Sequence, residues 1–180
     1  MNVLVTAASK HGGTAEIAAW IGEELGRHGV QAVVREPGDV ESLDGYDAVV
    51  LGSAVYVGKW MEPATHLVER LQKQFRDRPV FLFSSGPAGD PPKPDKDPGD
   101  VEAMRDLSQA LDHRLFAGRI ARSQMGFGER AVITALRVPD GDYRPRTEVE
   151  SWARGIAERL TSTVATPPVP TAVWRVPTTD

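Results

Sequence analysis

The sequence predicts a doubly wound α/β fold: a five-stranded parallel sheet, in the order 2-1-3-4-5, with helices on both faces. Short apolar runs alternate along the chain with longer segments in which apolar residues recur at helical spacing. Each run is continuously apolar, as is typical of strands that are covered on both sides. Right-handed crossovers between such strands place the ligand-binding loops at the carboxyl edge of the sheet.

Length and composition limit the classes of protein to consider. The 180 residues are expected to form one main domain with a sizeable core. A formal net charge of −4, without a dense basic stripe, disfavours nucleic-acid binding. The absence of cysteine excludes disulfides, thiol nucleophiles and cysteine-ligated metals, and we identify no metal-ligand set. With no membrane-spanning apolar run and no signal-peptide layout, we expect a soluble cytoplasmic protein.

The first half of the chain follows the alternating pattern closely. Ile17, Ala18, Ile21 and Leu25 recur at helical spacing, and Gly29 lies just past the last of them. Signals of this kind predict strands over 2–7, 30–34, 46–51 and 80–83, and helices over 14–27, 40–43 and 60–77.

The second half is less regular. The Pro-, Gly- and Asp-rich stretch 86–99 is longer than most connections and is interpreted as a binding loop or a solvated excursion. Beyond it, the pattern predicts helices over 101–111, 124–137 and 146–161 and a strand over 114–120. We expect the domain to cover 1–160 and the Thr-, Pro- and Val-rich tail 161–180 to be disordered.

The segment 124–137 lies where a minimal fold of this type would pass directly to its last helix. We interpret its apolar stripe first as core, second as a homodimer contact, and third as a contact with a membrane surface or a quinone. The stripe consists of Met125, Phe127, Ala131, Val132, Ala135 and Leu136.

The loop between the first strand and the first helix has the composition of a phosphate-binding turn. Its backbone N–H groups and those of the first helical turn converge where the helix dipole favours negative charge. Glycines allow a close approach, hydroxyl groups donate, and basic side chains add charge. A turn that merely caps a helix is the alternative. The candidate residues are Ser9, Lys10, His11, Gly12, Gly13 and Thr14.

Two further loops should meet the first at the same edge, because the first, third and fourth strands are neighbours in this order. The second loop offers an aromatic face at Tyr56 for a flat ring, while Trp60 is expected to belong to the core. The third loop offers small polar residues. The candidates are Ala54, Val55, Tyr56, Val57 and Gly58 in the second loop, and Ser84, Ser85 and Gly86 in the third.

Three other α/β nucleotide or receiver sites fit poorly. A dinucleotide Rossmann site would need G-x-G-x-x-G, whereas the first loop has only the adjacent Gly12 and Gly13. A P-loop would need Gly-Lys-Ser/Thr, which is absent. A phospho-receiver domain would need acidic residues at the ends of the first and third strands, where this chain has Ala7-Ala8 and Gly52-Ser53.

With these loops in view, residues 2–160 resemble the flavodoxin superfamily. Within it they are similar to flavodoxin-domain proteins of the menaquinone-dependent protoporphyrinogen dehydrogenase type. The resemblance is carried by Ser9–Ala18, Tyr46–Gly58 and Phe83–Pro87, and by the extra segment 119–143. It implies non-covalent FMN, with the phosphate held by residues 9–14 and the isoalloxazine ring bordered by 54–58 and 84–86.

The chain departs from the usual flavodoxin pattern in two loops. His11 stands where a threonine is usual and Gly13 where an asparagine is usual, so two side-chain donors are altered while main-chain donors remain. The second loop also lacks the acidic cluster that often surrounds the flavin. With fewer negative charges nearby, the flavin more readily takes the negative charge that it gains on reduction. This favours two-electron chemistry.

The expected function is an FMN-dependent oxidoreductase that passes electrons between a reduced substrate and a quinone-like acceptor; the resemblance implies protoporphyrinogen as substrate. The flavin would supply the chemistry, so we assign no catalytic acid or base. His28, His66 and His113 are interpreted as structural residues on helix faces or ends. The alternatives are a flavodoxin-type electron carrier, which would need a redox protein partner, and a regulatory module without FMN.

Overall fold

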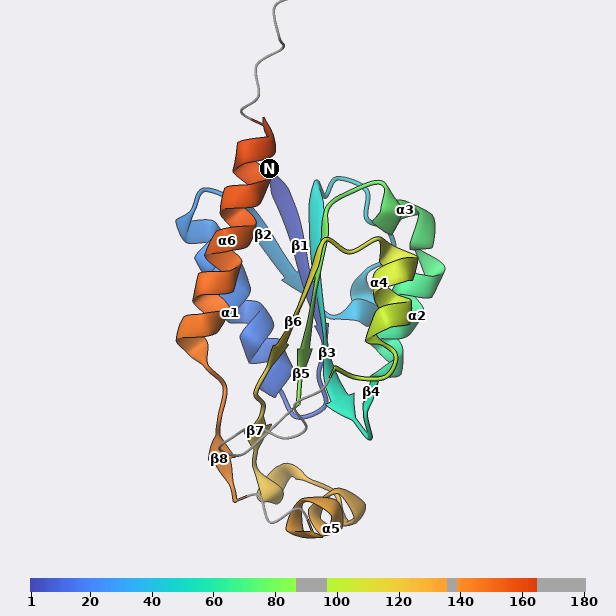
Figure 1. Ribbon diagram of the computed structural model, residues 1–180, viewed down its shortest axis with the longest axis vertical. Helices are drawn as coiled ribbons and strands as arrows, with labels where there is room; N and C mark the ends of the chain where they lie inside the picture. Colours follow the sequence, from blue (N-terminus) through green and yellow to red (C-terminus); the bar gives the residue numbers. More distant parts are fainter. Residues whose placement is uncertain (87–96, 136–138, 165–180) are drawn as a thin grey trace, which may run out of the picture.

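The computed structural model describes residues 1–86, 97–135 and 139–164. Within them, five parallel strands form the sheet in the order β2-β1-β3-β5-β6, and the short β4 pairs antiparallel with β3 (Figure 1). Without β4, this is the predicted order 2-1-3-4-5, which is confirmed. The strands are β1 (Asn2–Ala8), β2 (Gln31–Arg35), β3 (Ala48–Tyr56), β4 (Lys59–Trp60), β5 (Val80–Ser85) and β6 (Asp112–Phe116).

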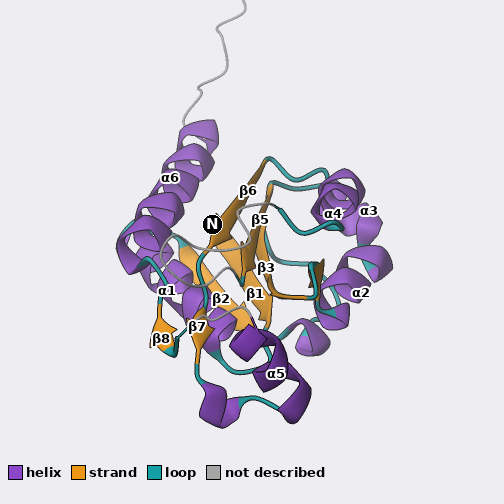
Figure 2. Ribbon diagram, turned by 60° about the horizontal axis from the view of Figure 1, so that its bottom comes forward, coloured by secondary structure: helices purple, strands orange, loops and turns teal. Residues whose placement is uncertain are grey.

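Helices cover both faces of the sheet (Figure 2). α1 (Gly13–Arg27) and α6 (Arg146–Val164) lie on one face, and α2 (Glu62–Arg70), α3 (Gln72–Arg76) and α4 (Val101–Ser108) lie on the other. Alternate residues of β1 divide the core between the two faces: Val3 and Val5 pack with α1 and α6, and Leu4 packs with α2 and α3. None of the helices in the described residues has the length and apolar character needed to cross a membrane.

A small subdomain lies beyond the carboxyl edge of the sheet (Figure 1). β7 (Arg119–Ile120) and β8 (Gly141–Asp142) form an antiparallel ribbon, and η2 (Arg122–Gln124) and α5 (Phe127–Ala135) lie between them in sequence. The single strand predicted over 114–120 is therefore wrong. The chain leaves the sheet after Phe116, and Gly118 passes so close to Gly86 that an added Cβ would lie 3.4 Å from its Cα.

The helix predicted over 40–43 is also wrong. Proline starts a single 3-10 turn earlier, η1 (Pro37–Asp39), and the following residues are extended toward α2 and α3. The carbonyl oxygens of Val40 and Leu43 accept hydrogen bonds from Arg70 and Arg78, respectively. Side chains from α2 and from the turn that follows α3 therefore satisfy backbone carbonyls that a helix would have used internally.

Several helix boundaries differ from the prediction: the helix expected over 101–111 ends at Ser108, and the one expected over 124–137 begins at Phe127. The helix expected over 60–77 begins at Glu62, because Trp60 belongs to β4, and it is interrupted at Leu71, where φ is −110°. The last helix continues past 161 to Val164, so the first four residues of the predicted tail are helical. The rest of the tail, 165–180, and residues 87–96 of the long loop lie outside the described residues.

The interpretation of the stripe on 124–137 as core is wrong for the side chains that the structure describes. Phe127 is 93% exposed, Ala131 and Ala135 are exposed, and Met125 is half-buried. The physical reason is position: α5 lies beyond the sheet edge, where neither core cluster extends. The side chains of Val132 and Leu136 are not described. The homodimer contact stays a prediction.

Candidate functional site

The turn between β1 and α1 has the features of an anion cradle. Gly12 precedes α1 with φ +78°, a region that favours glycine. In the first turn of α1, the N–H groups of Gly13 and Thr14 have no intrahelical acceptor. The Oγ atom of Ser9 is buried and has no hydrogen-bond partner in the structure. A buried hydroxyl without a partner is costly, so a bound anion would satisfy it.

The first loop meets the second at Tyr56. The rings of His11 and Tyr56 lie 6.4 Å apart between centroids, at an interplanar angle of 63°. Nζ of Lys10 lies 5.1 Å from the centroid of the Tyr56 ring. The predicted phosphate residues and the predicted stacking residue are therefore neighbours in space, although more than forty positions separate them in the sequence.

The second loop is a tight β-hairpin. Tyr56 pairs with Lys59 across the turn, and the two turn residues, Val57 and Gly58, have φ values of +51° and +73°. Positive φ at both positions is the mark of a type I′ turn, in which Asn-Gly is the usual sequence. Valine is β-branched and rarely adopts such a φ. Its side chain is fully exposed, so the turn presents a strained apolar residue beside Tyr56.

The third loop packs closely against the second. A Cβ added at Gly86 would lie 2.8 Å from Cβ of Val55, so only glycine fits there. The last residue of the stretch 86–99 is hydrogen-bonded to the same hairpin: the N–H of Gly99 donates to the carbonyl of Gly58 at 2.9 Å. Oδ2 of Asp100 accepts a hydrogen bond from the N–H of Trp60 at 2.8 Å. The three predicted loops are thus brought together at one edge of the sheet.

Within the third loop, the serines lie deeper than Gly86. Ser84 is fully buried; its Oγ accepts from Nε1 of Trp60 at 2.7 Å and lies 2.9 Å from Nε2 of His113. Ser85, 4% exposed, pairs in register with Ala54 of β3. The hydroxyl of Ser84 therefore forms its hydrogen bonds inside the protein, whereas Gly86 lies in the loop that follows β5.

His113 lies in β6, so its prediction as a residue of a helix face or end is wrong. His28 caps the end of α1 and His66 lies in α2, as expected. Burial lowers the pKa of His113, and Arg105 lowers it further, while Asp97 and Asp112 act in the opposite direction. A neutral imidazole at this position accepts from Ser84 at Nε2 and directs Nδ1 to Asp97, whose Oδ1 lies 3.4 Å away.

Two arginines that no sequence motif had indicated contact the first loop. Nη2 of Arg119 donates to the carbonyl oxygen of His11 at 3.1 Å, and Nη1 of Arg144 donates to that of Gly13 at 3.0 Å. Arg144 also binds Asp142, and the hydrogen bond from Arg144 holds the pKa of Asp142 below its ordinary value. The reciprocal bond raises the pKa of Arg144.

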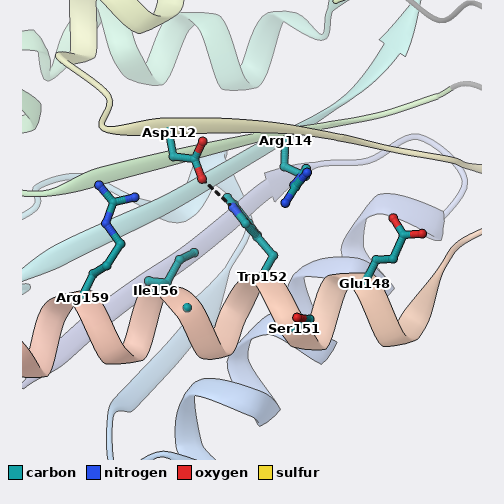
Figure 3. Close-up of a pocket in the computed structure, with 8 residues that line it drawn as sticks. Asp112, Arg114, Glu148, Ser151, Trp152, Ile156 and Arg159 are labelled. Atoms are coloured by element: carbon teal, nitrogen blue, oxygen red, sulfur yellow. Dashed lines mark hydrogen bonds between the residues drawn. The ribbon is translucent and has the colours of Figure 1, made fainter.

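A groove of about 430 Å³ lies elsewhere, between β6 and α6 (Figure 3). Charged side chains such as Arg114 and Arg159 line it, and Nε1 of Trp152 donates to Oδ2 of Asp112 across it at 2.9 Å. None of the predicted site residues lines this groove. The three loops, rather than the groove, therefore form the candidate site.

Comparison with known protein families gives the decisive match. A family described as "Flavodoxin domain" matches residues 4–145 of the chain. This chain belongs to the flavodoxin-domain family. The match begins in β1 and ends just before α6, so it includes all three loops of this flavodoxin-domain protein as well as its β7–β8 ribbon.

Solved structures share the fold at low sequence identity. A flavodoxin from the domain Archaea is 16% identical, with a TM-score of 0.62 over 89% of this chain and 99% of the archaeal chain. A mutant flavodoxin from Pseudomonas aeruginosa is 15% identical, with a TM-score of 0.61 and the same coverage. Rubredoxin oxygen:oxidoreductase from Desulfovibrio gigas is 10% identical, with a TM-score of 0.64 over 92% of this chain and 37% of that one. The search of curated proteins found no match.

Membership of this family implies a flavin cofactor, and the residues present fit one. The buried hydroxyl of Ser9 and the positive φ of Gly12 suit a phosphate group. Tyr56 offers an aromatic face next to that position. In the described residues, no group of three or more His, Asp or Glu side chains is placed to hold a metal ion.

Proposed function

We propose that this flavodoxin-domain protein is an FMN-dependent oxidoreductase that passes electrons between a reduced substrate and a quinone-like acceptor. One observation carries the proposal: a turn with an unsatisfied buried hydroxyl, Ser9, lies next to the loop that bears Tyr56. A phosphate at one end of a ligand and a flat ring at the other match these two features.

The residues would divide the binding of FMN between two regions. Ser9, Lys10, His11 and the main chain over 12–14 would hold the phosphate. Tyr56 would contact the ring, with its neighbours in 54–58 and the third-loop residues 84–86 at the border; of these, Gly86 lies nearest the loop edge. The cofactor supplies the electron-transfer chemistry, while the protein supplies orientation, electrostatics and access.

The charges within the second loop itself support two-electron chemistry. Lys10 lies over Tyr56, and Lys59 pairs with Tyr56 across the hairpin, whereas residues 54–61 include no acidic side chain. Positive charges near a flavin favour the negative charge that it gains on reduction. Because of the sequence resemblance, protoporphyrinogen is the first electron donor to test, and quinones are the first electron acceptors.

The test begins with flavin binding. We expect the purified protein to bind FMN more tightly than riboflavin, which has the same ring without the phosphate; fluorescence quenching measures both affinities. The FMN-loaded protein is then reduced anaerobically by protoporphyrinogen or dithionite and mixed with menadione. Reoxidation by the quinone faster than that of free reduced FMN supports the proposal. Failure to bind FMN, or reoxidation no faster than the free cofactor, contradicts it.

A flavodoxin-type electron carrier is the second candidate. It is favoured by the extent of the structural match, since the chain covers 99% of two flavodoxin chains. A carrier would take up its two electrons in separate one-electron steps and exchange them with a redox protein. An anaerobic spectroscopic titration separates the candidates: one two-electron step favours the oxidoreductase, and two resolved steps without quinone turnover favour the carrier.

A further inference from the structure

The two arginines that bind the first loop share one anchor on α1. Nη1 of Arg119 lies 2.8 Å from Oε1 of Glu16, and Nη2 of Arg144 lies 2.8 Å from Oε2 of the same carboxylate. Arg144 is further enclosed: its side chain is 3% exposed and its guanidinium lies 4.6 Å from the centroid of the Trp20 ring. Glu16 therefore fixes both guanidinium groups against the loop.

The bonded carbonyls determine where the loop's N–H groups point. A peptide group is planar and trans, so its C=O and N–H point in opposite directions. An arginine bonded to the carbonyl of His11 fixes the N–H of Gly12, and one bonded to the carbonyl of Gly13 fixes the N–H of Thr14. Both N–H groups are held pointing away from the arginines, toward the opposite side of the loop.

We infer that Arg119 and Arg144 are positioning residues that hold the first loop in the shape that binds a phosphate. The inference deepens the proposed FMN site and rests on it. Gly12 and Gly13 have no side-chain donor, so at these positions only main-chain N–H groups can bind the phosphate. Donors that are oriented before binding lose less entropy when the ligand arrives. We name the two arginines, with Glu16, the arginine brace.

The brace acts through geometry rather than net charge. Arg119 and Arg144 are balanced by Glu16 and Asp142, with which they form ion pairs. A lysine at 119 would keep the charge, but its single nitrogen lacks the planar fork that spans the carbonyl of His11 and the carboxylate of Glu16. Charge attraction and positioning therefore predict different results for Arg119→Lys.

The binding test compares FMN with riboflavin in the wild type, Arg119→Met and Arg119→Lys. We expect the preference for FMN to fall about tenfold in both variants, while the affinity for riboflavin changes by less than about twofold. Arg76→Met is the matched control, because Nε of Arg76 also donates to a backbone carbonyl, that of Leu107, at 3.2 Å on the other face of the sheet. An unchanged preference in the Arg119 variants, or full recovery with lysine, overturns the inference.

A second measurement needs no flavin and keeps this inference separate from the proposed function. Amide hydrogen exchange in the flavin-free protein should quicken about tenfold over residues 9–14 in Arg119→Met and stay unchanged in Arg76→Met. If the wild type binds no flavin, the proposed function fails and the phosphate role fails with it, while faster exchange still establishes the brace. Unchanged exchange in Arg119→Met overturns the brace itself.

Discussion

The Oγ atom of Ser84 lies 2.9 Å from Nε2 of His113, deep between β5 and β6. Trp60 donates to the same hydroxyl from the hairpin, and Asp97 lies beside the other ring nitrogen of His113. These polar contacts connect the second loop to Asp97, near the end of the stretch 86–99. Its position inside the sheet means that the protonation state of His113 affects stability.

We predict that the protein loses stability as the pH falls below about 6.5 because of His113. The pKa of His113 is lowered in the folded state, chiefly by burial, from an ordinary value of 6.5. The unfolded chain therefore takes up a proton that the folded chain resists, and the contribution is fully present only above pH 6.5. Urea unfolding at about pH 7.5 and about pH 5.5 measures the effect. His113→Gln should flatten this dependence; an equally steep loss in that variant would contradict the assignment.

Gly52→Ala should destabilise the protein strongly. A Cβ at this position would lie 2.1 Å from Cζ of Phe83, its partner across β3 and β5, so the ring or the strand must move. Overpacking of this kind costs about 1–3 kcal/mol or more. The control is Gly155→Ala in α6, where nothing lies within 4 Å and alanine should stabilise the helix by about 0.5–1 kcal/mol. Urea denaturation of both variants checks the opposite signs.

Val57→Asn should stabilise the flavin-free protein by about 1 kcal/mol. Asparagine tolerates the φ of +51° that strains valine, and the fully exposed valine side chain has no buried contacts to lose. The midpoint of urea unfolding, with an unchanged slope, measures the gain. A drop in stability would mean that the valine makes contacts that relieve the strain.

Tyr56→Leu should weaken FMN binding by about 2- to 12-fold, which corresponds to the 0.5–1.5 kcal/mol of an aromatic contact beyond area burial. The leucine keeps an apolar side chain but removes the ring that lies beside His11 and Lys10. Tyr56→Phe retains the ring and should bind FMN as the wild type does. Equal affinities of the leucine and wild-type proteins would remove Tyr56 from the site.

Local patterns were sufficient to predict the strand order of the sheet and the meeting of the three loops. Runs such as Ala48–Leu51 and Val80–Phe83 are continuously apolar, and the order of parallel strands follows from the crossovers. The neighbouring positions of the first and second loops then follow from the pairing of Ala8 with Ser53. The flavin contacts themselves stay predictions.

The remaining features depend on contacts that no short pattern records. The β3 strand continues to Tyr56 because a hairpin turn lies at Val57 and Gly58. The turn was not predicted, because a valine occupies the position where asparagine usually indicates such a turn. His113 lies in an edge strand that begins with polar residues, so no apolar run marked its start. Helical spacing predicted a helix within 124–137, where α5 covers Phe127–Ala135, but spacing does not reveal what packs against a helix, and Phe127 is exposed.

The contacts of the arginine brace also bear on how the protein matures. Arg119 is 108 positions from His11, and Arg144 is 131 positions from Gly13. A ribosome therefore synthesises the cradle more than a hundred residues before either of the arginines that support it. Tight binding of the cofactor should accordingly await synthesis of Arg119 and Arg144, and nascent fragments that end before Arg119 should bind FMN more weakly than the 180-residue chain.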